Sequence, residues 1–279
     1  MKPSLPRALA VSCLAIVFAA QATLPAALAQ PAPKTSFEPQ VGQAGKDVIW
    51  VPTAQALVDK MLDMAKVTPQ DYVIDLGSGD GRTVITAAKR GATALGIEYN
   101  PDMVALSKQN AEKEGVTGKA TFVQGDIFQT DFSKATVLTM FLLSTLNLKL
   151  RPTILNMKPG TRVVSNSFDM GEWTPDETVT ITDNCTSHCR AHFWLVPAKV
   201  DGTWKMGEGE LVLKQDFQML SGTLKNGNVS AIVINGKMAG EQITFTAGNT
   251  QYTGKVNGNV IEGTAKTGDK ELKWQATRG

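Results

Sequence analysis

The pattern of hydrophobic and polar positions divides most of the chain into two regions of different character. Between residues 48 and 199, short runs of consecutive apolar residues alternate with stretches in which apolar residues recur every three or four positions. The first pattern indicates strands buried on both faces, and the second indicates helices that cover them. From residue 200 to 279, apolar and polar positions alternate, and Asn-Gly or similar pairs punctuate the sequence. We therefore predict an α/β domain with a doubly wound sheet over residues 48–199. A small antiparallel β domain, a barrel or a sandwich of about six to eight strands, is expected over residues 200–279.

The first of these regions is organised around a strand, a glycine-rich turn and a helix. Tyr72–Leu76 is a short apolar run, the turn GSGDG follows at once, and residues 82–90 have the apolar spacing of a helix. Glycines let the chain bend sharply and let backbone N–H groups approach a ligand. This order is the nucleotide-binding start of a Rossmann-like, doubly wound sheet.

Two acidic residues end the next two predicted strands. Glu98 closes LGIE, just before a helix that Asn100 caps and Pro101 begins, and Asp126 closes TFVQGD. Parallel strands of such a sheet present their carboxyl ends at one edge, where ligands bind. Glu98 can there accept protons from both hydroxyls of a ribose, and Asp126 can accept from an adenine amino group. The alternative for Asp126 is a turn residue without a ligand.

The spacing Asp-x-Gly-x-Gly-x-Gly from Asp75 to Gly81, with Glu98 and Asp126 at the following strand ends, resembles the class I S-adenosylmethionine-dependent methyltransferases. The resemblance implies S-adenosyl-L-methionine as the cofactor. It also implies that the residues before the first helix, Trp50 to Thr53, lie across that cofactor. Thr53 is expected to cap this helix, whose apolar face packs in the core.

The composition of the amino-terminal residues predicts segments that lie outside the two domains. Lys2 and Arg7 precede an apolar run over residues 8–20, and Ala27-Leu28-Ala29 is a cleavage site, so residues 1–29 are predicted to be a secretory signal peptide. An uncleaved membrane anchor is the alternative. Cleavage would leave 26 basic and 26 acidic residues, so the net charge gives no reason to expect nucleic acid or an anionic membrane as a partner. After cleavage no stable membrane span is expected. Residues 30–47, rich in Pro, Gln, Gly and Lys, are expected to be a disordered lead-in. The protein is expected to be periplasmic or secreted.

The fourth and fifth strands bear on the reaction. Residues 136–143 predict a strand buried on both faces, residues 148–157 predict a helix interrupted by Pro152, and TRVVSNSF predicts the fifth strand. The acid- or Asn-Pro-Pro-aromatic motif of enzymes that methylate planar amino groups is absent after the fourth strand, where FLLSTLN stands instead. Phe141, Leu142 and Leu143 suit either core packing or the wall of an apolar channel that favours a neutral lysine amine.

Several segments together resemble the protein-lysine methyltransferases of mitochondrial membrane proteins, such as the c-type subunit of ATP synthase, and their bacterial relatives. The similarity covers about residues 48–200 and includes VPTAQALVDKMLDMA, TMFLLSTLNLKLRP, KPGTRVVSNSFDM and EWTP. It implies a lysine of a protein as the methyl acceptor. Export sets this chain apart from family members that face mitochondrial or cytoplasmic substrates.

The residues assigned to the site form two sets. The cofactor-binding set is Val51, Pro52, Thr53, Asp75, Gly77, Ser78, Gly79, Asp80, Gly81, Glu98, Tyr99, Asn100, Asp126, Ile127 and Phe141. The set expected to orient the acceptor amine lies at or just beyond the ends of strands four and five: Ser144, Asn147, Asn166 and Asp169. No general base and no metal site are assigned.

The segment CTSHCRAH, from Cys185 to His192, is the other notable cluster. Its flanks TVTIT and AHFWLVP predict a hairpin loop. In an oxidising compartment a disulfide between Cys185 and Cys189 is expected, although four Cys and His side chains also suit a metal ion. On the predicted fold this loop lies on the cofactor side of the sheet, where it can shape the substrate entrance.

Other functions stay open at this point. A small amine, thiol or hydroxyl compound can replace a protein as the acceptor. A non-catalytic protein that senses or scaffolds through the nucleotide-binding fold is the alternative outside enzymes. The sequence does not specify the oligomeric state or the role of the β domain.

Overall fold

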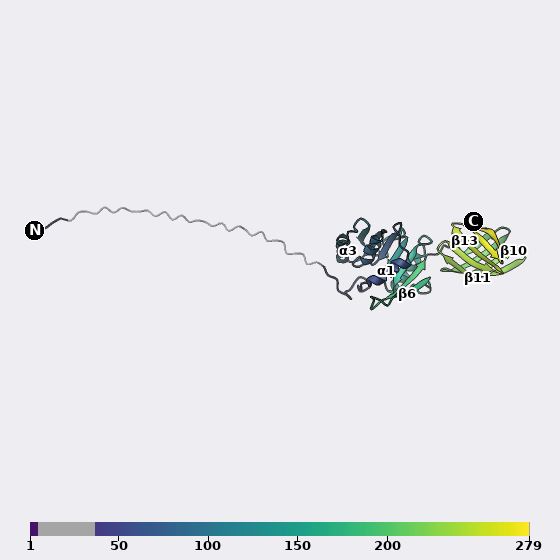
Figure 1. Ribbon diagram of the computed structural model, residues 1–279, viewed down its shortest axis with the longest axis horizontal. Helices are drawn as coiled ribbons and strands as arrows, with labels where there is room; N and C mark the ends of the chain where they lie inside the picture. Colours follow the sequence, from purple (N-terminus) through teal and green to yellow (C-terminus); the bar gives the residue numbers. More distant parts are fainter. Residues whose placement is uncertain (5–36, 279) are drawn as a thin grey trace. The chain divides into compact units, whose positions relative to one another are not determined.

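The computed structural model describes residues 1–4 and 37–278, so nearly all of the predicted signal peptide lies outside them (Figure 1). Strands β1 to β7 form one mixed sheet in the order β3-β2-β1-β4-β5-β7-β6. The first five strands are parallel, and β7 and β6 extend the sheet with antiparallel pairing. Their bounds are β1 Tyr72–Leu76, β2 Thr93–Glu98, β3 Ala120–Gln124, β4 Val137–Met140, β5 Arg162–Asn166, β6 Glu177–Thr180 and β7 Arg190–Leu195. This is the predicted doubly wound sheet.

Helices cover both faces of the sheet. On one face, α1 (Gln55–Met64), α2 (Arg82–Lys89) and α3 (Pro101–Lys113) pack on a core that includes Val73 of β1. On the other face, α4 (Ser144–Ile154) packs on a core that includes Ile74 and Leu76. Successive strand residues point to opposite faces, which is why the continuous apolar run of β1 serves both cores.

Strands β8 to β15 close into an antiparallel barrel (Figure 1). Their bounds are β8 Gly202–Met206, β9 Gly209–Asp216, β10 Met219–Asn226, β11 Val229–Ala239, β12 Gln242–Ala247, β13 Thr250–Asn257, β14 Val260–Thr267 and β15 Lys270–Thr277. The inward residues of the alternating pattern form one core, in which Phe245 stacks on Tyr252 and both rings meet Trp274 edge-on. A barrel, rather than a sandwich, is therefore the outcome for the predicted β domain.

Three local predictions were wrong. Strand β4 ends at Met140, so Phe141 to Leu143 form a connection rather than the end of a strand. Helix α4 then begins at Ser144 and carries Pro152 inside it. Thr53 does not cap α1: its Oγ1 accepts a hydrogen bond from Asn166 Nδ2 (3.1 Å), and Ala54 occupies the cap position without a side-chain bond.

Part of the lead-in that we expected to be disordered, residues 40–47, has defined contacts. Backbone hydrogen bonds join Gly42 N–H to the Trp50 carbonyl (2.8 Å) and Trp50 N–H to the Gln43 carbonyl (2.9 Å). We call residues 40–50 the amino-terminal hairpin. Its composition is that of a disordered segment, but contacts with the α/β domain fix it, as described below.

Gly81 shows how tightly the turn packs on the helices. It adopts φ +84°, and a Cβ there would lie 2.7 Å from the Phe122 ring and 2.8 Å from Ser107. We expect Gly81→Ala to destabilise the protein by about 2–4 kcal/mol. Alanine would have to adopt the left-handed conformation, and its methyl group would overpack the core, so the two costs add. Gly115→Ala is the matched control: Gly115 has φ +67° but open space around it, so only about 1 kcal/mol should be lost. Chemical denaturation compares the two, and equal losses would contradict the packing argument.

Candidate active site

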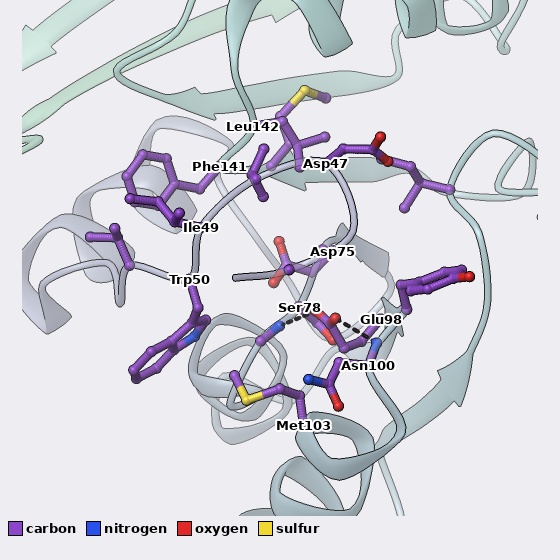
Figure 2. A pocket seen from close by; sticks show the side chains of 18 of the residues that line it. Asp47, Ile49, Trp50, Asp75, Ser78, Glu98, Asn100, Met103, Phe141 and Leu142 are labelled. Carbon is purple, nitrogen blue, oxygen red and sulfur yellow. Dashed lines mark hydrogen bonds between the residues drawn. The ribbon is translucent and has the colours of Figure 1, made fainter. Parts of the chain in front are cut away.

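A cavity of about 690 Å³ opens where the carboxyl ends of the parallel strands meet (Figure 2). Its wall takes residues from the ends of β1 to β5, from the loop before β7 and from the amino-terminal hairpin. Its size lies within the range of small-molecule sites. The edge of the sheet is the one at which doubly wound folds bind nucleotides.

The glycine turn and Glu98 are joined directly. Gly77 and Gly79 adopt φ +76° and +53° and, having no side chains, present their backbone at the cavity wall. The Glu98 carboxylate accepts the N–H of Gly79 through Oε2 and the N–H of Asn100 through Oε1, both at 2.9 Å (Figure 2). The carboxylate of β2 is thereby held at the glycine turn of β1.

Asp75 is a buried carboxylate in the same wall. Its Oδ1 accepts a 2.6 Å hydrogen bond from the Thr139 hydroxyl of β4. Burial raises the pKa of Asp75 to about 7, and the nearby negative charges of Glu98 and Asp80 contribute to the increase. Within residues 37–278, neither Asp75 nor Glu98 has a basic side chain at ion-pair distance. The cavity therefore holds negative charge that a cationic ligand can neutralise.

Asp126 has a different environment. Its Oδ2 pairs with Lys46 of the amino-terminal hairpin at 2.6 Å, and its Oδ1 accepts the Phe128 N–H at 2.9 Å. The hydrogen bond from Lys46 lowers the pKa of Asp126 and raises that of Lys46. The Lys46 ammonium also lies 4.9 Å from the centre of the Tyr99 ring. These contacts hold the hairpin against the end of β3.

The segment before α1 is fixed from the other side. Arg82 binds the Asp80 carboxylate through Nε and Nη2 and donates from Nη1 to the Thr53 carbonyl at 2.8 Å. Trp50 packs so closely on the glycine turn that a Cβ at Gly79 would lie 2.7 Å from its indole nitrogen. In Figure 2, Trp50 and Ile49 lie beside the cavity opposite Glu98.

The remaining part of the wall is aromatic. Phe141 follows β4, Phe168 follows β5, and His188 lies in the loop before β7. The predicted disulfide between Cys185 and Cys189 is confirmed and closes this loop. Because the two sulfurs are bonded to each other, they are not available as thiolate ligands for a metal ion.

The structure places the predicted cofactor residues as follows. All of them except Gly81 lie on the cavity wall. Gly81 instead precedes α2 and packs against Phe122, as described above. The roles assigned to the individual residues stay predictions.

None of the residues predicted to orient the acceptor amine lies on the cavity wall. Asn147 is buried and donates from Nδ2 to the carbonyls of Phe168 and Asp169, both at 3.1 Å. Asn166 is buried and holds Thr53. Asp169 is exposed and accepts the Gly171 N–H, and Ser144 begins α4. Strand ends hold both ligand-facing and inward-facing side chains, and spacing alone did not separate them.

Sequence reasoning missed part of the wall. The missed residues are Gln43 to Ile49 of the hairpin, Met61, Arg82, Thr83, Met103, Gly125, Met140, Leu146, Phe168 and His188. For Phe168 the signal was available, because it is the last residue of the predicted fifth strand TRVVSNSF and lies two positions beyond the end of β5.

Comparisons with known proteins agree with this geometry. A family model described as the ANTKMT methyltransferase domain matches residues 75–177. A protein-lysine N-methyltransferase from Saccharolobus islandicus (strain REY15A) is 46% identical over 144 residues, which cover 50% of this chain and 89% of that protein. A lysine N-methyltransferase of Homo sapiens, named for the C-type subunit of ATP synthase, is 34% identical over 128 residues, covering 46% of this chain and 54% of that relative.

A solved structure adds a bound ligand to the comparison. The crystal structure of an RNA methyltransferase from Salinibacter ruber, in complex with S-adenosyl-L-homocysteine, is 45% identical to this chain. The match has a TM-score of 0.50 and covers 54% of this chain and 96% of that one.

The fold, the glycine turn and the acidic strand ends, together with these relatives, define a class I methyltransferase that uses S-adenosyl-L-methionine. The chain belongs to the family of protein-lysine N-methyltransferases. The site fits the cofactor: glycine backbone lies beside the carboxylates of Asp75 and Glu98, which have no basic partner within residues 37–278, and this suits an adenosyl group that carries a cationic sulfonium.

Proposed function

We propose that this protein is an exported methyltransferase that transfers methyl groups to lysine side chains of proteins. The observation that carries the proposal is the two-part cavity wall. One part has the acidic and glycine residues that suit an adenosyl sulfonium, and the other has the apolar and aromatic side chains that suit an alkyl amine. The name of the Saccharolobus islandicus relative, of which the chain covers 89%, supports a protein lysine as the acceptor.

When bound, the cofactor would supply a methyl carbon that is attached to a sulfonium. The lysine nitrogen first loses a proton to solvent; as the nitrogen bonds to this carbon, the C–S bond breaks and the sulfur keeps the electron pair. The chain therefore has to align the acceptor and keep its amine neutral. Leu142, buried, and Leu143, exposed, lie on the wall beside Phe141. An apolar wall disfavours the ammonium form of the acceptor by desolvation.

Export is supported by the pattern of residues 1–29 and by the disulfide in the loop before β7, because disulfides persist in oxidising compartments. The described residues include no helix that is both long and apolar enough to cross a membrane. Mass spectrometry of the protein isolated from its own cells should find Gln30 as the first residue. A chain that retains residues 1–29 would contradict cleavage.

Transfer of a methyl-labelled cofactor tests the proposed acceptor. The chain from residue 30 is incubated with labelled S-adenosylmethionine and an extract of periplasmic proteins, and Glu98→Ala serves as the inactive control. Label that enters protein, is released by protease and appears as methyllysine after acid hydrolysis supports the proposal. Label that ribonuclease releases, or that stays in small molecules, would show a different acceptor.

A further inference from the structure

We propose that the loop closed by Cys185 and Cys189 positions the acceptor lysine, because its disulfide holds His188 against Phe141 and Phe168. This inference rests on the proposed function, since it assigns the acceptor part of the same cavity. It assigns a role to His188 and to the Cys185–Cys189 disulfide, neither of which methyl transfer by itself requires.

The strand order separates the two parts of the cavity. Across the sheet, the wall residues follow the order β3, β2, β1, β4, β5 and β7. Asp126 and Glu98 lie at the tips of β3 and β2, and the glycine turn at the tip of β1. Phe141 and Phe168 follow β4 and β5, and His188 precedes β7, whose first residues pair with the end of β5. The aromatic part is therefore the part farther from the acids that suit adenosine.

The three rings are close enough to form one surface. The His188 ring centre lies 5.1 Å from that of Phe141 and 6.2 Å from that of Phe168. The two phenyl rings are stacked with centres 6.0 Å apart. His188 is exposed, whereas the phenylalanines are partly buried, so the histidine forms the outer end of the surface.

Hydrogen bonds fix the Phe168 side of this surface. The Phe168 carbonyl accepts from the Ser165 hydroxyl at 2.7 Å and from Asn147 Nδ2 at 3.1 Å. The Ser167 N–H donates to the Arg190 carbonyl at 2.8 Å, which joins the end of β5 to the start of β7. The buried Asn147 thus positions Phe168 without reaching the cavity itself.

The disulfide fixes the His188 side. It links two residues only four positions apart, and the Cys189 carbonyl accepts the Ile181 N–H at 2.9 Å. His188 adopts φ +54° inside this small ring. A left-handed conformation is uncommon for a residue with a side chain, so it persists where the surroundings impose it. Reduction would remove the constraint that directs His188 at the two phenyl rings.

The chemistry of the surface suits a lysine side chain. The four methylene groups of lysine can pack on aromatic faces, and methylated ammonium groups are attracted to such faces. Adding the rings to the apolar segment after β4 also excludes water from the acceptor nitrogen, which favours its neutral form before methylation.

Proton NMR tests the placement without turnover. The chain has two histidines, and the second, His192, is buried with its Nδ1 2.9 Å from Thr178 Oγ1. It serves as an internal control. The probe is n-butyltrimethylammonium, which has the length of a lysine side chain and a charge independent of pH, added to the protein saturated with S-adenosylhomocysteine. We expect the His188 ring protons to shift and the His192 protons to stay in place. Absence of a His188 shift would overturn the proposal.

Kinetics test the consequence for the acceptor. His188→Ala should raise the KM for the protein that becomes labelled in the transfer experiment above about five- to tenfold, equivalent to the loss of one aromatic contact, with kcat and the Kd for S-adenosylhomocysteine nearly unchanged. Ser187→Ala in the same exposed loop is the matched control and should have no effect.

The disulfide is tested by replacing both cysteines. The double variant Cys185→Ser, Cys189→Ser should raise the KM by a similar factor, and adding His188→Ala to it should give little further change, because both act through one contact. An unchanged KM in His188→Ala or in the double cysteine variant would overturn the inference. Failure of the parent to bind S-adenosylhomocysteine would instead contradict the proposed function, whereas a His188 shift without methyl transfer would support the inference and contradict only the activity.

Discussion

Replacing Glu98 by alanine should weaken the binding of S-adenosylhomocysteine at least about 100-fold, because it removes a carboxylate that can accept both ribose hydroxyl protons. Hydrogen bonds to a charged group contribute about 1.5–3 kcal/mol each, so two of them correspond to a factor of about 10² to 10⁴. In the structure the same carboxylate accepts the N–H groups of Gly79 and Asn100. The variant therefore also loosens the glycine turn.

A second variant separates these two effects. Glu98→Gln keeps one oxygen as an acceptor, so it can retain one backbone hydrogen bond and one ribose contact, and should lose about 10- to 100-fold. Glu112→Ala, an exposed change on α3, is the control for the loss of a carboxylate. Isothermal titration calorimetry measures the affinities, and circular dichroism verifies the fold. Parent-like affinity in Glu98→Ala would show that this carboxylate does not hold the cofactor.

Replacing Asp75 by asparagine should have two opposite effects at pH 8: higher stability of the free protein and weaker binding of S-adenosylmethionine. The folded-state pKa of about 7 lies well above the ordinary value of 3.8, mainly because the carboxyl group is buried. The protonated Asp75 carboxyl group therefore favours folding. This contribution to the free energy of unfolding is fully present only below about pH 4 and is lost as the pH rises through 7. Asparagine cannot ionise and can still accept the Thr139 hydrogen bond. We expect a gain of roughly 2 kcal/mol in the free energy of unfolding at pH 8.

The pH dependence checks the sign of this effect. The stability gain of Asp75→Asn over the parent should shrink as the pH is lowered from 8 toward 4, whereas Glu112→Gln should show no such trend. The parent's affinity for S-adenosylmethionine should fall below about pH 7, where Asp75 becomes protonated and no longer attracts a cation. Asp75→Asn should bind about tenfold more weakly at pH 8 and lack this pH dependence. Urea denaturation and calorimetry at several pH values measure both, and a less stable variant at pH 8 would contradict the argument.

The sequence was informative wherever local chemistry determines structure. Apolar runs predicted the parallel strands, and the Gly77 to Gly81 turn predicted the cavity beside β1. Alternation and hairpin turns predicted an antiparallel β domain, but they did not decide between a barrel and a sandwich. Cys185 and Cys189 were predicted to bond because the predicted export implies an oxidising compartment.

Features that depend on long-range contacts were not predictable. The amino-terminal hairpin has the composition of a disordered segment, and it is ordered by Lys46, which pairs with Asp126 80 positions away. Asn166 and Asn147 looked like ligand-facing amides, but each binds a distant part of the chain. The loop of His188 was predicted to lie near the substrate entrance, but the contact of His188 with Phe168 depends on the antiparallel pairing of β7 with β5. Pattern and spacing do not specify such partners.

Calorimetric titration of the chain from residue 30 with S-adenosylhomocysteine tests the central claim most directly. The account predicts saturable binding of one ligand per chain, abolished or reduced at least about 100-fold in Glu98→Ala. Absence of binding by the folded parent would contradict it.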